Sequence, residues 1–263
     1  MYKAILLGAL QGITEFLPVS SSGHLVIAQH LLGVGDIPLL FDVLLHVATL
    51  IVVLGVFWNK IAPILISLFR LLTGSRTEED RANGKLALIL LIGTAITAGL
   101  GLVIKDLPIF ANPHFTSAMF LVTAVLLMST AFAKKQGRNL RQIKISDGII
   151  IGLIQGLAVI PGISRSGSTI SAGLLKGIDR ESAGDFSFLL FVPAVLGALI
   201  LELKDLGQLA TDIPFNYMLS GMLSAFIAGY YALLFLLRLI RGGKLYLFSI
   251  YLIPVGILGL IYL

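Results

Sequence analysis

The chain has 263 residues, of which 57% are hydrophobic and 13% charged, and its mean hydropathy is +0.99. A soluble globular domain is about 45–50% apolar and about 25% charged, so this composition excludes an ordinary soluble protein. The absence of cysteine excludes disulfides and thiolate metal sites. The net charge of +5 does not indicate a nucleic-acid partner, because most basic residues fall in short segments between apolar runs, as in membrane proteins.

Six apolar blocks each have close to the ~20 residues that a helix needs to cross a bilayer. In chain order they are residues 39–58, 86–104, 115–133, 182–203, 217–239 and 245–263. The first apolar run begins almost at Met1 and leads directly into a polar motif, which is not the pattern of a cleavable signal. Residues 61–72 are apolar but few and include Arg70. We interpret them as an interfacial helix, with an extension of the first span as the alternative.

The sequence contains an internal repeat. Residues 5–24 align without a gap on residues 149–168, and seven of the twenty positions are identical. Each copy has a short apolar run (4–17 or 149–160), a proline-containing polar loop, and a second short run (25–32 or 170–175). Because such runs are too short to span, each copy is predicted to form a re-entrant helical hairpin. The identical pairs are Ile5/Ile149, Gly8/Gly152, Gln11/Gln155, Gly12/Gly156, Ser20/Ser164, Ser22/Ser166 and Gly23/Gly167.

Three spans follow each hairpin, so the prediction is an all-α polytopic membrane protein with six transmembrane helices and two re-entrant hairpins. The whole chain, residues 1–263, forms one membrane domain, with repeat 1 at about 1–133 and repeat 2 at about 147–263. Alternate connections are basic, and by the positive-inside rule they lie in the cytoplasm. The two halves then have inverted topology, and both termini lie outside. The basic residues are Lys60, Arg70, Arg76, Arg81 and Lys85; Lys134, Lys135, Arg138, Arg141 and Lys144; and Arg238, Arg241 and Lys244, against only Lys105 and Lys204 in the other connections.

The first polar loop concentrates reactive side chains. Gln11 and Glu15 share one face of a helix, since they are four residues apart. An ionisable group at membrane depth costs roughly 2.5–3.5 kcal/mol and normally faces a polar cavity. A structural pairing of Glu15 with His24 is the alternative. The loop continues with Ser20, Ser21, Ser22, Gly23 and His24.

The second polar loop is suited to binding an anion. Its small residues allow backbone amides to turn inward, and the helix that follows presents its positive end. Arg165 adds a guanidinium fork that fits phosphate oxygens. The alternative role for Arg165 is an ion pair with Glu15, and the two roles are compatible. The loop also carries Ser164, Ser166, Gly167, Ser168 and Thr169.

Polar residues at the span borders are less specific. Asp42 and His46 lie four apart on a span and would bind a metal or make a structural contact, of which the second is commoner. Asp185 and Asp147 are interpreted as helix-end or hairpin-orienting groups rather than catalysts, and residues 186–188 as packing within a span.

The motifs resemble those of the undecaprenyl-diphosphate phosphatases of bacterial plasma membranes. The first is [E/Q]-x-x-x-E followed by P-V-S-S-[ST]-G-H, at residues 11–15 and 18–24, and the second is P-G-x-S-R-S-x-x-T at residues 161–169. The stretches at 41–46 and 186–190 are also similar to the family. The resemblance extends along essentially the whole chain. It implies removal of the terminal phosphate from undecaprenyl diphosphate, recycling of the lipid carrier for peptidoglycan synthesis, and bacitracin resistance.

The resemblance also implies the site. Glu15, Ser21, His24 and Arg165 would be catalytic, and the substrate would contact Gln11, Ser20, Ser22, Gly23, Ser164, Ser166, Gly167 and Thr169. A divalent cation, Mg²⁺ or Ca²⁺, would take part with Glu15 as a ligand, although Gln11 is the neutral variant of its motif position and removes one carboxylate. The nucleophile stays open between Ser20, Ser21, His24 and water.

Two other functions compete with phosphate hydrolysis. Inverted repeats with broken helices are a transporter design, so the alternative is a transporter or flippase of a phosphorylated polyprenyl lipid. A purely structural membrane protein would leave both polar loops unexplained. Glycine-rich spans such as residues 92–101 allow close helix contact, either within the chain or in a homodimer.

Overall fold

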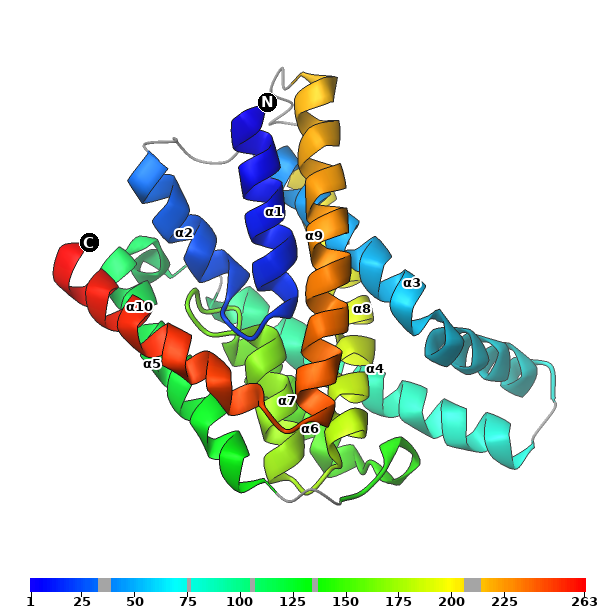
Figure 1. Ribbon diagram of the computed structural model, residues 1–263. Coiled ribbons are helices and arrows are strands. Elements are labelled where there is room, and N and C mark those ends of the chain that lie inside the picture. The colour runs from blue at the N-terminus through cyan, green and yellow to red at the C-terminus, as the bar shows by residue number, and fades with distance from the viewer. Residues whose placement is uncertain (33–38, 75–76, 105–106, 134–136, 206–213) are drawn as a thin grey trace.

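The computed structural model describes residues 1–32, 39–74, 77–104, 107–133, 137–205 and 214–263. Within these ranges the chain forms ten α-helices and a few short 3₁₀ turns (Figure 1). The α-helices are α1 (Tyr2–Phe16), α2 (Ser21–Leu32), α3 (Leu39–Leu72), α4 (Glu78–Ile104), α5 (Pro113–Ser129), α6 (Ile145–Leu157), α7 (Arg165–Leu175), α8 (Arg180–Asp205), α9 (Phe215–Arg241) and α10 (Phe248–Tyr262).

Six helices of the described part are long and apolar enough to cross a membrane, which confirms the six predicted spans. They are α3, α4, α5, α8, α9 and α10, with α5 and α10 each extended by a 3₁₀ turn. At residues 61–72 the alternative, an extension of the first span, is what the structure shows, because α3 continues without a break to Leu72 and contains Pro63. Its end packs antiparallel on the start of α4, where Asn83 Nδ2 donates to Ser67 Oγ at 2.9 Å. Among the basic residues of the connections, Arg76, Lys105, Lys134 and Lys135 lie outside the described residues.

Four short helices carry the repeated motif, with α1 and α2 around the first loop and α6 and α7 around the second. Leu17, just after α1, is extended (φ −59°, ψ 143°) because Pro18 follows it. Both second helices begin with a serine cap. Ser20 Oγ accepts from the Gly23 amide at 3.4 Å, and Ser164 Oγ accepts from the Gly167 amide at 3.1 Å.

The first helix of each motif packs on a span of the other half. Helix α1 lies along α9, with Gly8 against Gly221 and Gly12 against Ala225, and Figure 1 shows the two running in the same direction. Helix α6 lies along α4 in the same way, with Gly148 against Ile89 and Gly152 against Gly93. Glycine allows the backbones to approach closely in both interfaces. Gly93 belongs to the glycine-rich segment 92–101, and its close helix contact is therefore made within the chain.

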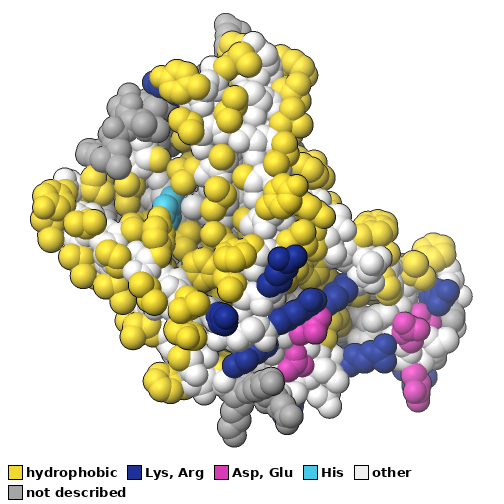
Figure 2. Space-filling view, viewed as in Figure 1, with side chains coloured by type: hydrophobic (Ala, Val, Ile, Leu, Met, Phe, Trp, Pro, Cys, Tyr) yellow, Lys and Arg dark blue, Asp and Glu magenta, His cyan; other side chains and the backbone are white. Residues whose placement is uncertain are grey.

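Charged side chains gather in two places. Figure 2 shows apolar side chains over most of the face, with Lys, Arg, Asp and Glu where α9 ends and again where α3 ends and α4 begins. Arg238 and Arg241 lie in the last turn of α9, and Arg241 pairs with Glu181 at 3.0 Å. The same end holds an ion pair between Lys60 of α3 and Asp185 of α8.

In this charged region a clamp, formed by Arg138 and Asp147, holds the start of α6, the first helix of the second motif. Arg138 hydrogen-bonds to both carboxylate oxygens of Asp147, the latter on α6, and donates to the Lys176 carbonyl at 2.8 Å. The hydrogen bonds to Asp147 raise the pKa of the Arg138 guanidinium above its ordinary value. Asp147 is 1% exposed, so the aspartate that the sequence assigned to a helix end is the buried half of this clamp.

Candidate active site

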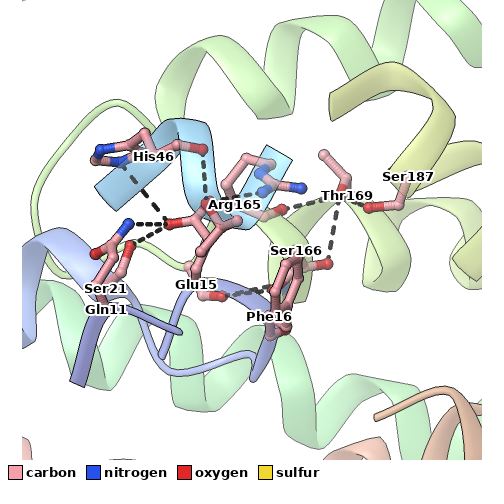
Figure 3. A network of polar contacts seen from close by, with 12 residues as sticks. Gln11, Glu15, Phe16, Ser21, His46, Arg165, Ser166, Thr169 and Ser187 are labelled. Atoms are coloured by element: carbon pink, nitrogen blue, oxygen red, sulfur yellow. Dashed lines mark hydrogen bonds and ion pairs between the residues drawn. The ribbon is translucent and has the colours of Figure 1, made fainter. Parts of the chain in front are cut away.

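The Glu15 carboxylate is the centre of a polar cluster that joins the two motifs (Figure 3). Its Oε1 accepts from Arg165 Nη2 at 2.8 Å. Its Oε2 accepts from Gln11 Nε2 at 3.1 Å and from Ser21 Oγ at 2.6 Å. Each partner supplies a hydrogen, which is the arrangement that an ionised carboxylate requires. The predicted ion pair between Glu15 and Arg165 is therefore present.

Ser21 lies in direct contact with the Glu15 carboxylate. It is the first residue of α2, and its hydroxyl donates to the Glu15 carboxylate. A carboxylate in contact with a hydroxyl can remove the proton as the oxygen attacks. The N-terminal end of a helix also favours negative charge, such as that developing on the attacking oxygen.

Ser20 has a different role from its neighbour. It is buried, and its backbone has φ +70°, which is unusual for a residue with a side chain. Its Oγ accepts from the amides of Gly23 and Gly162, the latter at 3.1 Å in the second loop. Ser20 therefore ties the two loops together.

The two loops also meet through the second motif. Ser166 Oγ donates to the Phe16 carbonyl at 3.0 Å, and Ser164 and Ser166 hydroxyls lie 3.3 Å apart. A side chain at Gly23 would lie 3.0 Å from the Gly162 amide nitrogen, so the glycine permits this close approach. The N-termini of α2 and α7 thus come together beside Glu15, and helix N-termini are favourable places for an anion.

Arg165 has an unused donor at this meeting point. Its side chain is 16% exposed, and its Nη2 is occupied by Glu15. Its Nη1 is buried and has no hydrogen-bond partner among the described residues. A buried guanidinium nitrogen without a partner is costly, and a phosphoryl oxygen would satisfy it.

His24 lies on another side of the loop from the Glu15 cluster. Its Nδ1 is 2.8 Å from the Ser20 carbonyl, and its Nε2 is 2.8 Å from the Tyr251 hydroxyl of α10. A carbonyl only accepts, so Nδ1 carries the hydrogen, and in the neutral ring Nε2 accepts from tyrosine. The imidazole also stacks on the Tyr251 ring at 5.7 Å. The predicted pairing of His24 with Glu15 is replaced by these contacts.

His46 reaches the site, although its spacing to Asp42 predicted only a metal site or a structural contact. Its Nε2 is 4.0 Å from Glu15 Oε2, and its Nδ1 is 3.0 Å from the Asp42 carbonyl and 3.7 Å from Asp42 Oδ2. The four-residue spacing to Asp42 was visible in the sequence, but the proximity to Glu15 depends on how α3 packs against α1. Ser187 was likewise assigned to span packing, yet its hydroxyl lies 2.6 Å from Thr169 Oγ1.

The cluster fits a cation only if the substrate contributes ligands. In the described part of the chain, no three His, Asp or Glu side chains converge as a metal site. Gln11 Oε1 is, however, a buried acceptor without a hydrogen-bond partner, next to the Glu15 carboxylate. Mg²⁺ is often held by one or two protein groups together with phosphate oxygens. Glu15 and Gln11 fit that arrangement.

The fold and the site define a polytopic helical protein with a polar site, built from serine, glutamate and arginine side chains, where two loops meet. The sequence profile of the family described as bacitracin resistance protein BacA matches residues 4–258, and the chain belongs to this family. An undecaprenyl-diphosphatase of Treponema denticola is 45% identical over 259 residues, which is 98% of this chain and 95% of that protein. Undecaprenyl-diphosphatases of Desulforapulum autotrophicum (41% over 271 residues; 99% and 98%) and Methanosphaera stadtmanae (39% over 269; 98% and 96%) are also similar.

Proposed function

We propose that this protein hydrolyses undecaprenyl diphosphate to undecaprenyl phosphate and phosphate, the reaction named for its relatives. The observation that carries the proposal is the contact of Ser21 with Glu15, which is itself paired with Arg165. A nucleophile, a base and a positive group beside an anion site are the parts that phosphoryl transfer needs. The reaction returns the lipid carrier to peptidoglycan synthesis and thereby confers bacitracin resistance.

In the first step, Ser21 Oγ attacks the terminal phosphorus. Its proton passes to Glu15, the new O–P bond forms, and the bond to the bridging oxygen breaks. Undecaprenyl phosphate leaves with the bonding electron pair. Arg165 Nη1 and the positive ends of α2 and α7 stabilise the charge on the transferred phosphoryl oxygens.

In the second step, water attacks the phosphoserine. Glu15, having passed its first proton to solvent, takes a proton from that water. As the serine–phosphate bond breaks, Glu15 returns that proton to Ser21 Oγ, which restores the hydroxyl and the carboxylate, and inorganic phosphate is released. The same carboxylate thus serves as base in both halves of the reaction.

A divalent cation, Mg²⁺ or Ca²⁺, belongs to the proposal. Glu15 and Gln11 would hold it together with oxygens of the diphosphate. When bound, it would neutralise phosphate charge. The proton transfers above are made by Ser21 and Glu15 themselves.

We infer that the protein lies in the bacterial plasma membrane as an inverted repeat. Both termini then lie outside, and the site opens to the outer face. Two interfaces support the repeat: α1 on α9 and α6 on α4, each parallel and glycine-mediated. The equivalent serine caps at Ser20 and Ser164 support it further. The basic end at Arg238 and Arg241 supports the orientation, since basic residues collect on the cytoplasmic side.

The alternative of a lipid transporter is weaker. A carrier would need an anion site but no serine held against a carboxylate, and the relatives carry the name of a phosphatase. We therefore keep hydrolysis as the function.

The test is phosphate release from a polyprenyl diphosphate by protein purified in detergent, with and without Mg²⁺ or Ca²⁺. Ser21→Ala and Glu15→Gln should each lower kcat by about 10²-fold or more. Ser220→Ala, on α9 with its hydroxyl on the Tyr217 carbonyl, is the matched control and should keep wild-type turnover. Release that survives in Ser21→Ala would refute the serine mechanism. Absence of release from folded wild type that still binds the lipid would favour the transporter.

A further inference from the structure

Arg165 is held by more than its ion pair. Its guanidinium Cζ lies 3.9 Å from the centroid of the Phe191 ring, which comes from α8. Phe191 is 1% exposed, so the contact is shielded from solvent. An arginine packed on an aromatic ring is attracted by the electrons of the ring face, and the attraction is strongest when both groups are desolvated.

The same face of α8 also reaches the backbone of Arg165 indirectly, through the Thr169 side chain. Ser187 lies four residues before Phe191, so the two share one side of the helix. Thr169 Oγ1 donates to the Arg165 carbonyl at 2.8 Å and lies 2.6 Å from Ser187 Oγ. Because the threonine hydrogen is used by that carbonyl, Ser187 is the donor in the second contact. Helix α8 therefore fixes both the backbone and the guanidinium of Arg165.

We propose that Phe191 is a positioning residue that aims the guanidinium of Arg165 at the phosphoryl group. This inference rests on the proposed function. The ring attracts the cation without taking any of its N–H groups, whereas a carboxylate would occupy them. Nη2 stays on Glu15, and Nη1 keeps a donor that no described residue uses and that a phosphoryl oxygen would satisfy. A guanidinium held in place before the substrate arrives stabilises charge without being reorganised during the reaction.

A role of this kind differs measurably from core packing. If Phe191 only filled space, its loss would lower stability and leave phosphate affinity unchanged in the folded fraction. If it orients Arg165, its loss weakens binding of inorganic phosphate, and the effect follows the electron density of the ring. Phe186 provides the matched control, since it lies on the same helix and is 0% exposed. The cation–π contacts of the described residues are those of Arg165 with Phe191 and of Lys60 with Phe57, so Phe186 is not part of one.

The experiment compares Phe191→Leu, Phe191→Tyr and Phe186→Leu in phosphate release and in binding of inorganic phosphate by calorimetry. We expect Phe191→Leu to lose ~10-fold in kcat/KM and in phosphate affinity, while Phe191→Tyr, which keeps the ring face, stays within about threefold of wild type. Phe186→Leu should lose thermal stability and keep its phosphate affinity.

A second series of variants leaves the shape of the side chain unchanged, so that misfolding cannot account for a loss of activity. Mono-, di- and trifluorophenylalanine placed at position 191 keep the shape of the ring and weaken its negative face stepwise. Log kcat/KM should fall in step with fluorination at position 191 and stay flat at position 186. If kcat/KM responded equally to fluorination at positions 191 and 186, the inference would be overturned even with a wild type that releases phosphate. An inactive wild type would instead refute the proposed function, and phosphate binding would still decide the role of Phe191.

Discussion

Glu15 and Arg165 are 150 positions apart in the chain, yet Glu15 Oε1 accepts from Arg165 Nη2 at 2.8 Å. Glu15 comes from the end of α1, and Arg165 begins α7, so neither motif contains the site by itself. The side chains are 9% and 16% exposed. Because both side chains are buried, removing either one would leave the other as a buried charge without a partner, which destabilises the protein.

The first prediction concerns this dependence. Glu15→Gln and Arg165→Gln should each destabilise the protein by about 3–5 kcal/mol, because the remaining charge is left buried. The double variant should lose less than the sum, since no charge is left. Thermal unfolding of the four proteins in detergent measures the coupling. Strict additivity would show that the pair adds nothing to stability, and all three variants should lack phosphatase activity.

The second prediction concerns the covalent step. Substrate labelled in its terminal phosphate should leave label on Ser21 when the reaction is quenched within one turnover, because attack precedes hydrolysis. Peptide mapping identifies the residue. Ser21→Ala should carry no label, while His24→Gln should still carry it, since His24 is turned toward Tyr251. Label on His24, or turnover without any adduct under these conditions, would contradict the assignment of the nucleophile.

The third prediction uses the backbone of Ser20. Its φ of +70° costs less for glycine than for alanine, although both substitutions remove the hydroxyl that holds the Gly23 and Gly162 amides. Ser20→Gly should therefore be more stable than Ser20→Ala by about 1 kcal/mol. At this chain length that corresponds to about 2–4 °C in Tm. Equal melting temperatures would argue against a strained backbone at this position.

Several features could be predicted from the sequence because they depend on local patterns. Span positions follow from the length of apolar blocks, and the serine caps follow from the two repeated loops. Pairing of Glu15 with Arg165 was one of the alternatives, since buried charges need partners. Residues 61–72 were interpreted first as a separate interfacial helix because the run is short and includes Arg70. The helix continues there, with Ile61 and Ile64 buried and Ser67 bonded to Asn83.

Other features depend on packing between distant helices, which no local pattern encodes. His24 meets Tyr251 across 227 positions, and nothing near either residue specifies the partner. His46 approaches Glu15 only because α3 packs against α1. Phe191 looks like any phenylalanine of a span until α8 places it under Arg165. The meeting of Glu15 with Arg165 was therefore open to prediction from the sequence, and the contacts made by His24, His46 and Phe191 were not.

The fourth prediction concerns the clamp at the base of the second motif. Arg138→Ala would remove the hydrogen bonds to Asp147, which is buried but still accepts from the Lys144 amide at 2.8 Å. The expected cost is about 1–3 kcal/mol for the partly unsatisfied carboxylate. Arg141→Ala, on an exposed neighbour, is the control and should change stability little. A Tm unchanged in Arg138→Ala would mean that the clamp does not hold the motif.

The fifth prediction tests whether the two helix interfaces are equivalent. A methyl group at Gly12 would lie 2.8 Å from the Gly229 amide nitrogen in the α1–α9 interface. At Gly152 it would lie 2.7 Å from Gly93 Cα in the α6–α4 interface, whereas at Gly99 nothing lies within 4 Å. Overpacking against backbone costs about 1–3 kcal/mol, so Gly12→Ala and Gly152→Ala should lower Tm by similar amounts. Gly99→Ala should not lower it.

Because α1 carries Glu15 and α6 leads to the Arg165 loop, both destabilised variants should also lose activity through displacement of the ion pair. A loss confined to one variant would mean that a single interface holds the site together, and would remove the main support for the inverted repeat.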